Sequence, residues 1–182
     1  MNYFISTGEL SGDLHASYIV EKIKNLDKNA KVYAIGGMNL KKQDVEIVRD
    51  IDSLAIMGFV EVVKNFNFLK KVLEETVEFI LSNNIDRVVL VDYGGFNLKL
   101  LERLKLKKPS LKITYYIPPK VWIWGKKRVP KIAKADEILV IFPWEVDFYK
   151  KENVKALYFG NPFMEKYEKI TKKGDNILLL PG

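Results

Sequence analysis

The chain has 182 residues, and its apolar fraction of 48% and charged fraction of 29% are ordinary for a folded domain with a substantial core. It contains no cysteine and a single histidine, His15, which excludes disulfides, thiolate metal sites and any histidine-cluster metal site within one chain. The formal net charge of +7 favours anionic partners such as nucleic acid, phospholipid headgroups or phosphorylated substrates; a lysine-rich surface without a functional role is the alternative.

We expect no signal peptide, because an apolar run that fits a strand begins within two residues of Met1. No apolar run approaches the ~20 residues that a membrane-spanning helix needs. We therefore expect a cytoplasmic chain, which can still associate with a membrane surface.

Short apolar runs rich in Val, Ile and Tyr alternate with segments of helical periodicity along the chain. The predicted strands are 3–6, 32–35, a weaker one at 45–48, 87–92, 113–117, 138–141 and 157–159. The predicted helices are 12–25, 66–81, 96–106, 126–133 and 144–150. This alternation indicates an α/β fold, a Rossmann-like parallel sheet with helices on both faces. The runs VVLV and ILVI lack polar alternation, as expected of strands that are buried on both faces.

The last segment, NILLLPG at 176–182, has the pattern of a buried strand followed by a tight turn. A hydrophobic strand with nothing after it to cover it suits the start of another domain. We therefore predict one domain over residues 1–170, and over 171–182 a linker and the first strand of a second, truncated domain.

Glycine, proline, acidic and aromatic residues gather where the predicted strands end. The segments concerned are 8–13, 36–38, 92–97, 118–124, 143–145 and 160–162. Ligands bind beyond the carboxyl ends of the strands in such sheets, so these segments should converge on one edge. The pattern favours an enzyme or a ligand-binding site over a purely structural module. The first segment, GELSGD, matches neither a P-loop nor a dinucleotide-binding fingerprint.

Seven motifs occur in order along the chain. They are GELSGD at 8–13, GGM at 36–38, LAIMGFVEV at 54–62, DYGGFN at 92–97, YYIPPKVWIW at 115–124 with KKR at 126–128, PWEVDFY at 143–149, and GNP at 160–162. Together with the closing LLLPG, this series resembles the lipid-A-disaccharide synthase family of two-domain GT-B glycosyltransferases over essentially the whole chain. Two positions depart from the family pattern, since Gly94 stands where proline is usual and Lys120 where a small residue is common.

The resemblance implies that the chain is the N-terminal, acceptor-binding half of an inverting hexosyltransferase that needs no metal or cofactor. The implied reaction transfers 2,3-diacylglucosamine from UDP-2,3-diacylglucosamine to the 6-hydroxyl of 2,3-diacylglucosamine 1-phosphate. It forms the β-1,6-linked lipid A disaccharide precursor and releases UDP. The implied location is the inner face of the inner membrane, with an anionic membrane surface and no nucleic acid as partner. Because the other domain would hold the nucleotide-sugar, the chain alone is expected to be inactive.

Inverting sugar transfer needs a base that accepts the proton of the acceptor hydroxyl. Asp92 ends an apolar strand and precedes a glycine pair, so its carboxylate should point into the cleft, and the family's base candidate maps onto it. The alternative is a cap for the helix near Phe96. Glu9 and Asp13 remain alternative acids, although Asp13 can stabilise the dipole of its own helix without any catalytic role.

The predicted substrate-binding residues come from the same motifs. They are Gly8, Glu9, Ser11, Gly12, Asp13, Met57, Gly58, Glu61, Asn97, Trp122, Lys126 and Arg128. The glycines let the backbone approach a sugar or phosphate, the tryptophan can stack on a sugar or meet an acyl chain, and the basic residues can reach a phosphate. Several have structural alternatives: Ser11 as a helix N-cap, Asn97 as a tie within its own turn, and Trp122 as a packed side chain beside an exposed basic helix.

The segment 57–73, MGFVEVVKNFNFLKKVL, combines apolar residues with lysines, as an interfacial membrane segment requires. Its predicted membrane-contact residues are Val62, Phe66 and Leu69. A core-facing amphipathic helix is the alternative.

Two other functions remain open. One is a GT-B transferase that acts on a soluble sugar acceptor, and the other is a non-enzymatic module that binds RNA or an anionic lipid. RNA-binding domains expose aromatic residues on a sheet face or in a basic groove. Here aromatic and acidic residues gather in loops after strands, which disfavours nucleic acid as a partner.

Overall fold

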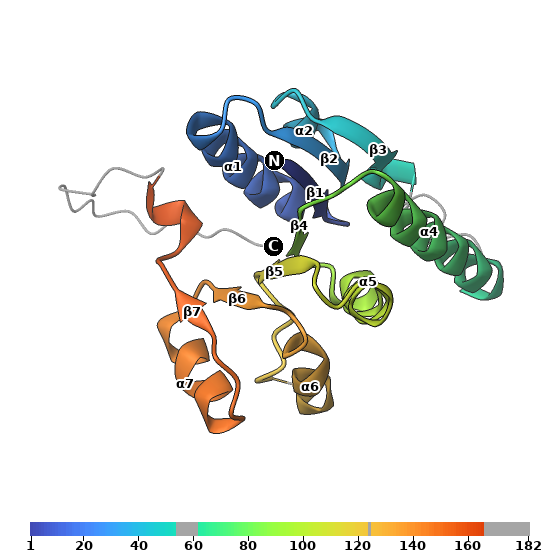
Figure 1. Ribbon diagram of the computed structural model, residues 1–182. Helices are drawn as coiled ribbons and strands as arrows, with labels where there is room; N and C mark the ends of the chain where they lie inside the picture. Colours follow the sequence, from blue (N-terminus) through green and yellow to red (C-terminus); the bar gives the residue numbers. More distant parts are fainter. Residues whose placement is uncertain (54–61, 124, 166–182) are drawn as a thin grey trace, which may run out of the picture.

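The computed structural model describes residues 1–53, 62–123 and 125–165, and they form a parallel seven-stranded sheet flanked by helices (Figure 1). The strands are β1 (Asn2–Ser6), β2 (Lys31–Gly36), β3 (Glu46–Asp50), β4 (Arg87–Val91), β5 (Lys112–Tyr116), β6 (Glu137–Val140) and β7 (Leu157–Tyr158). The helices are α1 (Leu10–Leu26), α2 (Met38–Lys41), α4 (Val62–Ser82), α5 (Gly94–Lys107), α6 (Val129–Ile132) and α7 (Pro143–Lys151), with 3-10 turns η1 (Lys126–Arg128) and η2 (Pro162–Glu165).

The predicted fold class is confirmed, and all seven predicted strands are present, including the weak one, which forms the edge strand β3. Helix α1 begins at Leu10 rather than at residue 12, and the helix predicted over 126–133 is divided between η1 and α6. The single turns α2 and η2 were not predicted, because one turn is too short to show helical periodicity. The strand predicted within 176–182 and the boundary near residue 170 lie outside the described residues.

The central strands are buried on both faces, as their unbroken apolar runs predict. In β1, Phe4 and Ile5 are both fully buried but belong to different hydrophobic clusters. The same alternation in β4 sends Leu90 to the first cluster and Val91 to the second. Because successive side chains of a strand point to opposite faces, one sheet supports two separate cores.

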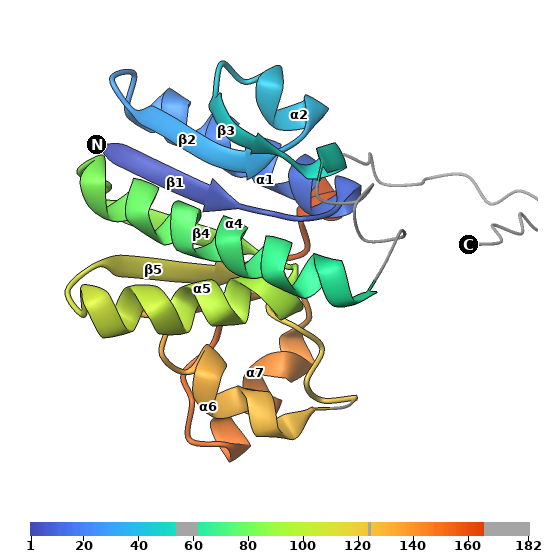
Figure 2. The same ribbon diagram turned by 90° about the vertical axis from the view of Figure 1, so that its right-hand side faces the viewer.

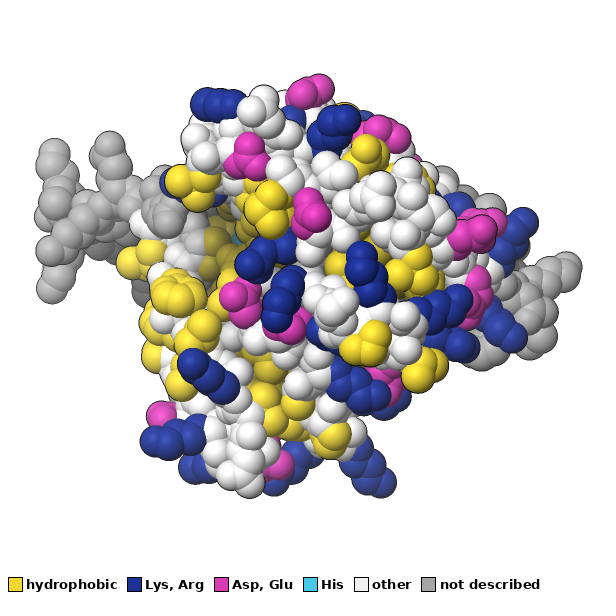
Figure 3. Space-filling view, viewed as in Figure 1, with side chains coloured by type: hydrophobic (Ala, Val, Ile, Leu, Met, Phe, Trp, Pro, Cys, Tyr) yellow, Lys and Arg dark blue, Asp and Glu magenta, His cyan; other side chains and the backbone are white. Residues whose placement is uncertain are grey.

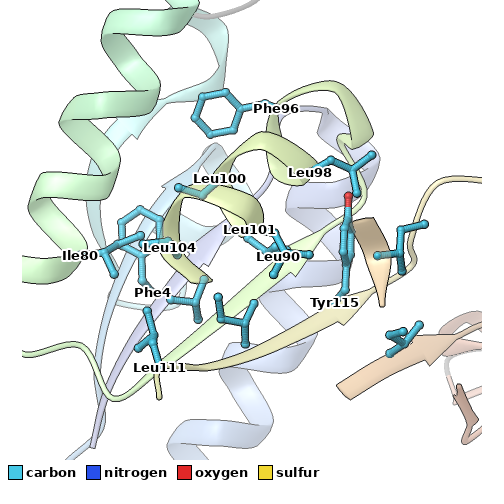
Figure 4. Packing of buried hydrophobic residues seen from close by; sticks show 14 of the residues in the cluster. Phe4, Ile80, Leu90, Phe96, Leu98, Leu100, Leu101, Leu104, Leu111 and Tyr115 are labelled. Atoms are coloured by element: carbon cyan, nitrogen blue, oxygen red, sulfur yellow. The ribbon is translucent and has the colours of Figure 1, made fainter. Parts of the chain in front are cut away.

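Helices α1 and α2 cover one face of the sheet, whereas α4, α5, α6 and α7 cover the other (Figure 1). This division follows from right-handed crossovers, because the chain adds strands outward from β1 to β3 and then outward from β4 to β7. Figure 2 shows α4 and α5 side by side in front of the sheet. The leucines of α5 pack towards Phe4, Leu90 and Leu111 (Figure 4). Truncation of one of them, as in Leu101→Ala, should cost about 2–5 kcal/mol.

The strand order is β3-β2-β1-β4-β5-β6-β7, so the direction in which strands are added reverses between β1 and β4. These two strands are hydrogen-bonded neighbours, with Ser6 paired to Leu90 at their carboxyl ends. The loops that follow them therefore leave the sheet side by side. In open parallel sheets, such a reversal point is where ligands bind.

Candidate active site

The turn after β4 holds two consecutive residues, Asp92 and Tyr93, in the left-handed backbone region, each with φ of 48°. This conformation is uncommon for residues other than glycine and costs of order 1–3 kcal/mol at each position. The backbone of Asp92 is held from two neighbouring elements. Its N–H donates to the carbonyl oxygen of Tyr116 at 3.1 Å, and its carbonyl oxygen accepts from the Tyr115 hydroxyl at 3.1 Å and from Asn97 Nδ2 at 2.9 Å.

Asn97 is fully buried and joins the ends of β1 and β4. Its Oδ1 accepts a hydrogen bond from Ser6 Oγ at 2.6 Å, and its Nδ2 also donates to the carbonyl oxygens of Ser6 and Val91, each at 3.2 Å. These contacts occupy both ends of the side-chain amide. Asn97 therefore positions the Asp92 turn, as the structural alternative from the sequence predicts, and has no exposed group to offer a substrate.

The carboxyl group of Asp92 is more basic than an ordinary aspartate. Burial raises the pKa of Asp92, while a backbone hydrogen bond from Tyr93 and the positive charge of Lys120 oppose the rise. A raised pKa makes the carboxylate a better proton acceptor. Lys120, which departs from the family pattern, thus acts on the candidate base, a connection that the sequence did not reveal.

Gly8, in the loop after β1, packs directly against the ring of Tyr93. A Cβ atom at Gly8 would lie 2.3 Å from ring carbons of Tyr93, so a side chain there would displace the ring. Burial and the negative charge of Glu9 raise the pKa of the Tyr93 phenol. The loops after β1 and β4 are thus in contact, and Tyr93, which the sequence analysis did not single out, joins them.

Helix α1 begins with Glu9 as its N-cap residue, and no side chain forms a cap hydrogen bond there. The interpretation of Ser11 as the N-cap is therefore wrong: Ser11 lies inside the first helical turn, with its side chain exposed. Because no side chain occupies the first N–H groups of α1, this end of the helix is suited to an anion.

Gly12 and Asp13 have structural roles. A Cβ atom at Gly12 would lie 2.3 Å from Thr7 Oγ1, so glycine is required for the close approach of α1 to this loop. The fully buried carboxylate of Asp13 accepts hydrogen bonds from the backbone N–H groups of Gly37 at 2.6 Å and Asn39 at 2.8 Å. It thereby stabilises the start of α2, a different helix from the one expected, and it is committed to the fold rather than available to a substrate.

Trp122 contacts helix α7, and Lys126 contacts the C-cap residue of that helix. Trp122 Nε1 donates to Glu145 Oε1 at 3.1 Å, and the other oxygen of this buried Glu145 accepts from the Phe142 N–H. Lys126 forms an ion pair with Glu152 at 2.6 Å. The hydrogen bond fixes the edge of the indole, but the Trp122 side chain is 37% exposed, so its ring face stays accessible for stacking. Arg128 differs, because its side chain is exposed and its charge acts on the Tyr115 phenol, which contacts the Asp92 turn.

Part of the predicted site lies outside the described residues. Met57, Gly58 and Glu61 belong to the undescribed segment 54–61, and the side chains of Val62 and Phe66 are not described either. Leu69 is described and is 37% exposed on α4, although Val72 and Leu73, later on the same helix, are buried in the core.

The charge and hydropathy of the described residues are mixed. On the face shown in Figure 3, lysine and arginine side chains lie interspersed with acidic ones, whereas a phosphate backbone is bound along a positively charged groove. Among the helices within 1–53, 62–123 and 125–165, none has the length and apolar character to cross a membrane. The same residues contain no cluster of three acidic or histidine side chains able to hold a metal ion.

Comparison with known proteins adds independent evidence. Residues 3–179 match the family model described as lipid-A-disaccharide synthetase. The lipid-A-disaccharide synthase of Geobacter metallireducens is 37% identical over 163 residues, which cover 89% of this chain and 42% of that protein. That of Persephonella marina is 36% identical over 166 residues, covering 89% and 42%, and that of Coxiella burnetii is 33% identical over 156 residues, covering 85% and 41%.

Among solved structures, UDP-GlcNAc 2-epimerase from Neisseria meningitidis, determined with bound UDP-GlcNAc, aligns with a TM-score of 0.64. The alignment covers 88% of this chain and 46% of the epimerase chain at 10% sequence identity, so it shows a shared fold. The chain thus spans about 42% of the length of a curated relative such as the Geobacter protein.

Proposed function

The chain belongs to the lipid-A-disaccharide synthetase family, and on that premise we propose that it forms the acceptor-binding part of an inverting glycosyltransferase. The family predicted from the seven motifs is thereby confirmed. The proposed donor is UDP-2,3-diacylglucosamine and the proposed acceptor is 2,3-diacylglucosamine 1-phosphate. The product is the β-1,6-linked disaccharide precursor of lipid A. We assign the donor to a second domain, in the part of the curated relatives that lies outside the region matched by this chain.

In the proposed reaction, the 6-hydroxyl oxygen of the acceptor attacks the anomeric carbon of the donor while the bond from that carbon to the diphosphate breaks. Asp92 accepts the hydroxyl proton, and UDP leaves with the bonding electrons, so the configuration at the carbon inverts. The observation that carries the proposal is the position of Asp92 in a strained, hydrogen-bonded turn at the reversal point of the sheet. The raised pKa of Asp92, caused by burial, supports its role as the base.

The acceptor would lie against the contacting loops after β1 and β4. Gly8 lets the ring of Tyr93 pack against the loop after β1, Glu9 and Ser11 lie at the open N-terminus of α1, and Arg128 offers a cation to the acceptor phosphate. Met57, Gly58 and Glu61 remain part of the proposed site on the basis of their motif. Trp122 also remains in the proposed site as a stacking residue, because its side chain is 37% exposed. We leave out Asp13, Asn97 and Lys126, whose polar groups already have partners within the fold.

We further propose that the enzyme works on the cytoplasmic surface of the inner membrane, because both substrates are lipids. The exposed Leu69 beside the exposed Lys70 and Lys71 supports contact with an anionic surface, as expected for the predicted segment that also includes Val62 and Phe66.

The function is tested by measuring UDP release from the diacylated donor in an enzyme that carries both domains. Release should require the diacylated acceptor and should fall ~100-fold or more in Asp92→Asn, which keeps the shape of the side chain but removes the proton acceptor. Equal release with a soluble, unacylated acceptor would instead support a transferase of soluble sugars. Undiminished release by a folded Asp92→Asn enzyme would remove Asp92 from the mechanism and direct attention to Glu9.

A further inference from the structure

A cavity of about 560 Å³ opens between α4 and α5 beside the candidate active site. Its volume falls within the range of about 300–1,000 Å³ that is typical of small-molecule sites. Its apolar walls come from Leu69 and Leu73 of α4 and from Tyr93, Gly95 and Phe96 at the start of α5. In Figure 4, the Phe96 ring projects from the first turn of α5 towards α4. We call this cavity the α4–α5 groove.

Tyr93 forms the boundary between the α4–α5 groove and the candidate base. It follows Asp92 directly, packs against Gly8, and stacks on Phe96 with ring centroids 5.7 Å apart and an angle of 27° between the rings. The apolar groove therefore starts one residue away from Asp92. A ligand whose reactive hydroxyl meets Asp92 can extend an apolar part between the two helices.

The charged residues that line the groove have an excess of positive charge. Lys70, Lys99 and Arg103 contribute three cations, and Arg103 also forms an ion pair with Glu74 at 3.5 Å. The acid in the lining, Glu102, is already paired with Lys131 at 2.9 Å and Lys134 at 3.1 Å. Apolar walls combined with a positive charge balance fit an amphiphile that has an anionic headgroup better than a neutral one.

We propose that the α4–α5 groove binds an acyl chain of an anionic, acylated sugar acceptor, an inference that rests on the proposed function. The chain would lie between Leu69 and Leu73 on one side and Phe96 on the other, and the cations would face the headgroup and acyl oxygens. Gly95 then controls the size of the groove, because a longer side chain at this position would occupy space that the acyl chain needs.

The test uses Gly95→Leu in the 182-residue chain, with binding measured by calorimetry. A Cβ atom at Gly95 would meet no atom within 4 Å, and the residue lies in the first turn of α5, so the backbone accepts the substitution. Leu69→Trp narrows the groove from α4, and this second blocking variant replaces the first if Gly95→Leu fails to fold. Lys107→Leu, at an exposed position on α5 outside the lining, is the matched control.

The ligands are 2,3-diacylglucosamine 1-phosphates of increasing chain length, glucosamine 1-phosphate, and alkyl phosphates without sugar. For the wild-type chain and Lys107→Leu, affinity should rise up to about fourfold for each added methylene until the groove is filled. Gly95→Leu and Leu69→Trp should bind the longest chains at least tenfold more weakly and should show little dependence on chain length. Their affinity for glucosamine 1-phosphate should not change.

An equal chain-length dependence in the wild-type chain and both blocking variants would overturn the proposal even if the acylated sugar binds, because the acyl chain would then lie elsewhere. If the alkyl phosphates show the dependence and lose it in the blocking variants while the sugar phosphates do not bind, the groove is an acyl-chain site and the proposed acceptor is wrong. The two proposals can therefore fail separately.

Discussion

Replacing Asn97 with alanine would test whether one buried amide holds the ends of β1 and β4 together. The wild-type side chain accepts from Ser6 Oγ at 2.6 Å and donates from Nδ2 to the carbonyl oxygens of Ser6, Val91 and Asp92. Because Nδ2 carries two hydrogens, the variant loses the equivalent of three hydrogen bonds. At about 1 kcal/mol for each, the free energy of unfolding should fall by about 3 kcal/mol, a large part of the ~5–15 kcal/mol typical of a native protein.

Urea denaturation followed by circular dichroism measures this loss. Asn29→Ala, at an exposed position on the same domain, is the matched control and should change stability by less than about 0.5 kcal/mol. Ser6→Ala combined with Asn97→Ala should be less destabilising than the sum of the single variants, because both remove the same 2.6 Å hydrogen bond. If Asn97→Ala and Asn29→Ala denature at the same urea concentration, the amide does not hold the strand ends and our account of the turn is wrong.

Three further outcomes are expected. Asp92→Asn should raise the melting temperature at neutral pH. Burial raises the pKa of Asp92 in the folded state, so the stability that the protonated carboxyl group gives at low pH is lost as the pH rises through that raised pKa, and asparagine avoids this loss. An unchanged or lower melting temperature would contradict this prediction. Replacing Val62, Phe66 and Leu69 with serine should release the protein from anionic vesicles in a sedimentation assay without unfolding it, whereas a much lower melting temperature with unchanged binding would make them core residues. In calorimetry, the chain alone should bind the acylated sugar phosphate weakly and should not bind UDP, and in a UDP-release assay it should show no turnover. Tight binding of UDP would place the donor site within these 182 residues.

The sheet was predictable because its strands are continuous apolar runs, and the positions of the strand-end motifs followed from them. The start of α1 was misplaced because Ser11 matches the residue preference of an N-cap, whereas Glu9 holds that position without a side-chain hydrogen bond. Helix α2 was missed because one turn is too short to show helical periodicity. Its single turn depends on backbone hydrogen bonds to Asp13, a residue 24 positions before Gly37.

The candidate site was predicted as a set of loops, but the roles within it depend on distant contacts. Asn97 reaches Ser6 across 91 positions of sequence, and Trp122 reaches Glu145 across 23. A local sequence pattern does not indicate contacts between residues that are so far apart in the chain. The sequence therefore left open whether these side chains bind substrate or stabilise the fold. The signal that could have been read is PWE at 143–145, where a proline at the first helical position and an acid in the first turn are typical of a helix start; Glu145 there accepts a hydrogen bond from the Phe142 N–H.

The central position of β1 has a consequence for how the chain folds during its synthesis. Asn2 at the start of β1 hydrogen-bonds to Asp86 just before β4, a separation of 84 positions. At about 5–20 residues per second, a ribosome needs roughly 4–17 s to add that length. Until then, β1 and β2 can pair with each other while the other edge of β1 stays open, and open strand edges promote aggregation. The nascent chain should therefore depend on chaperones most strongly in the interval before β4 emerges.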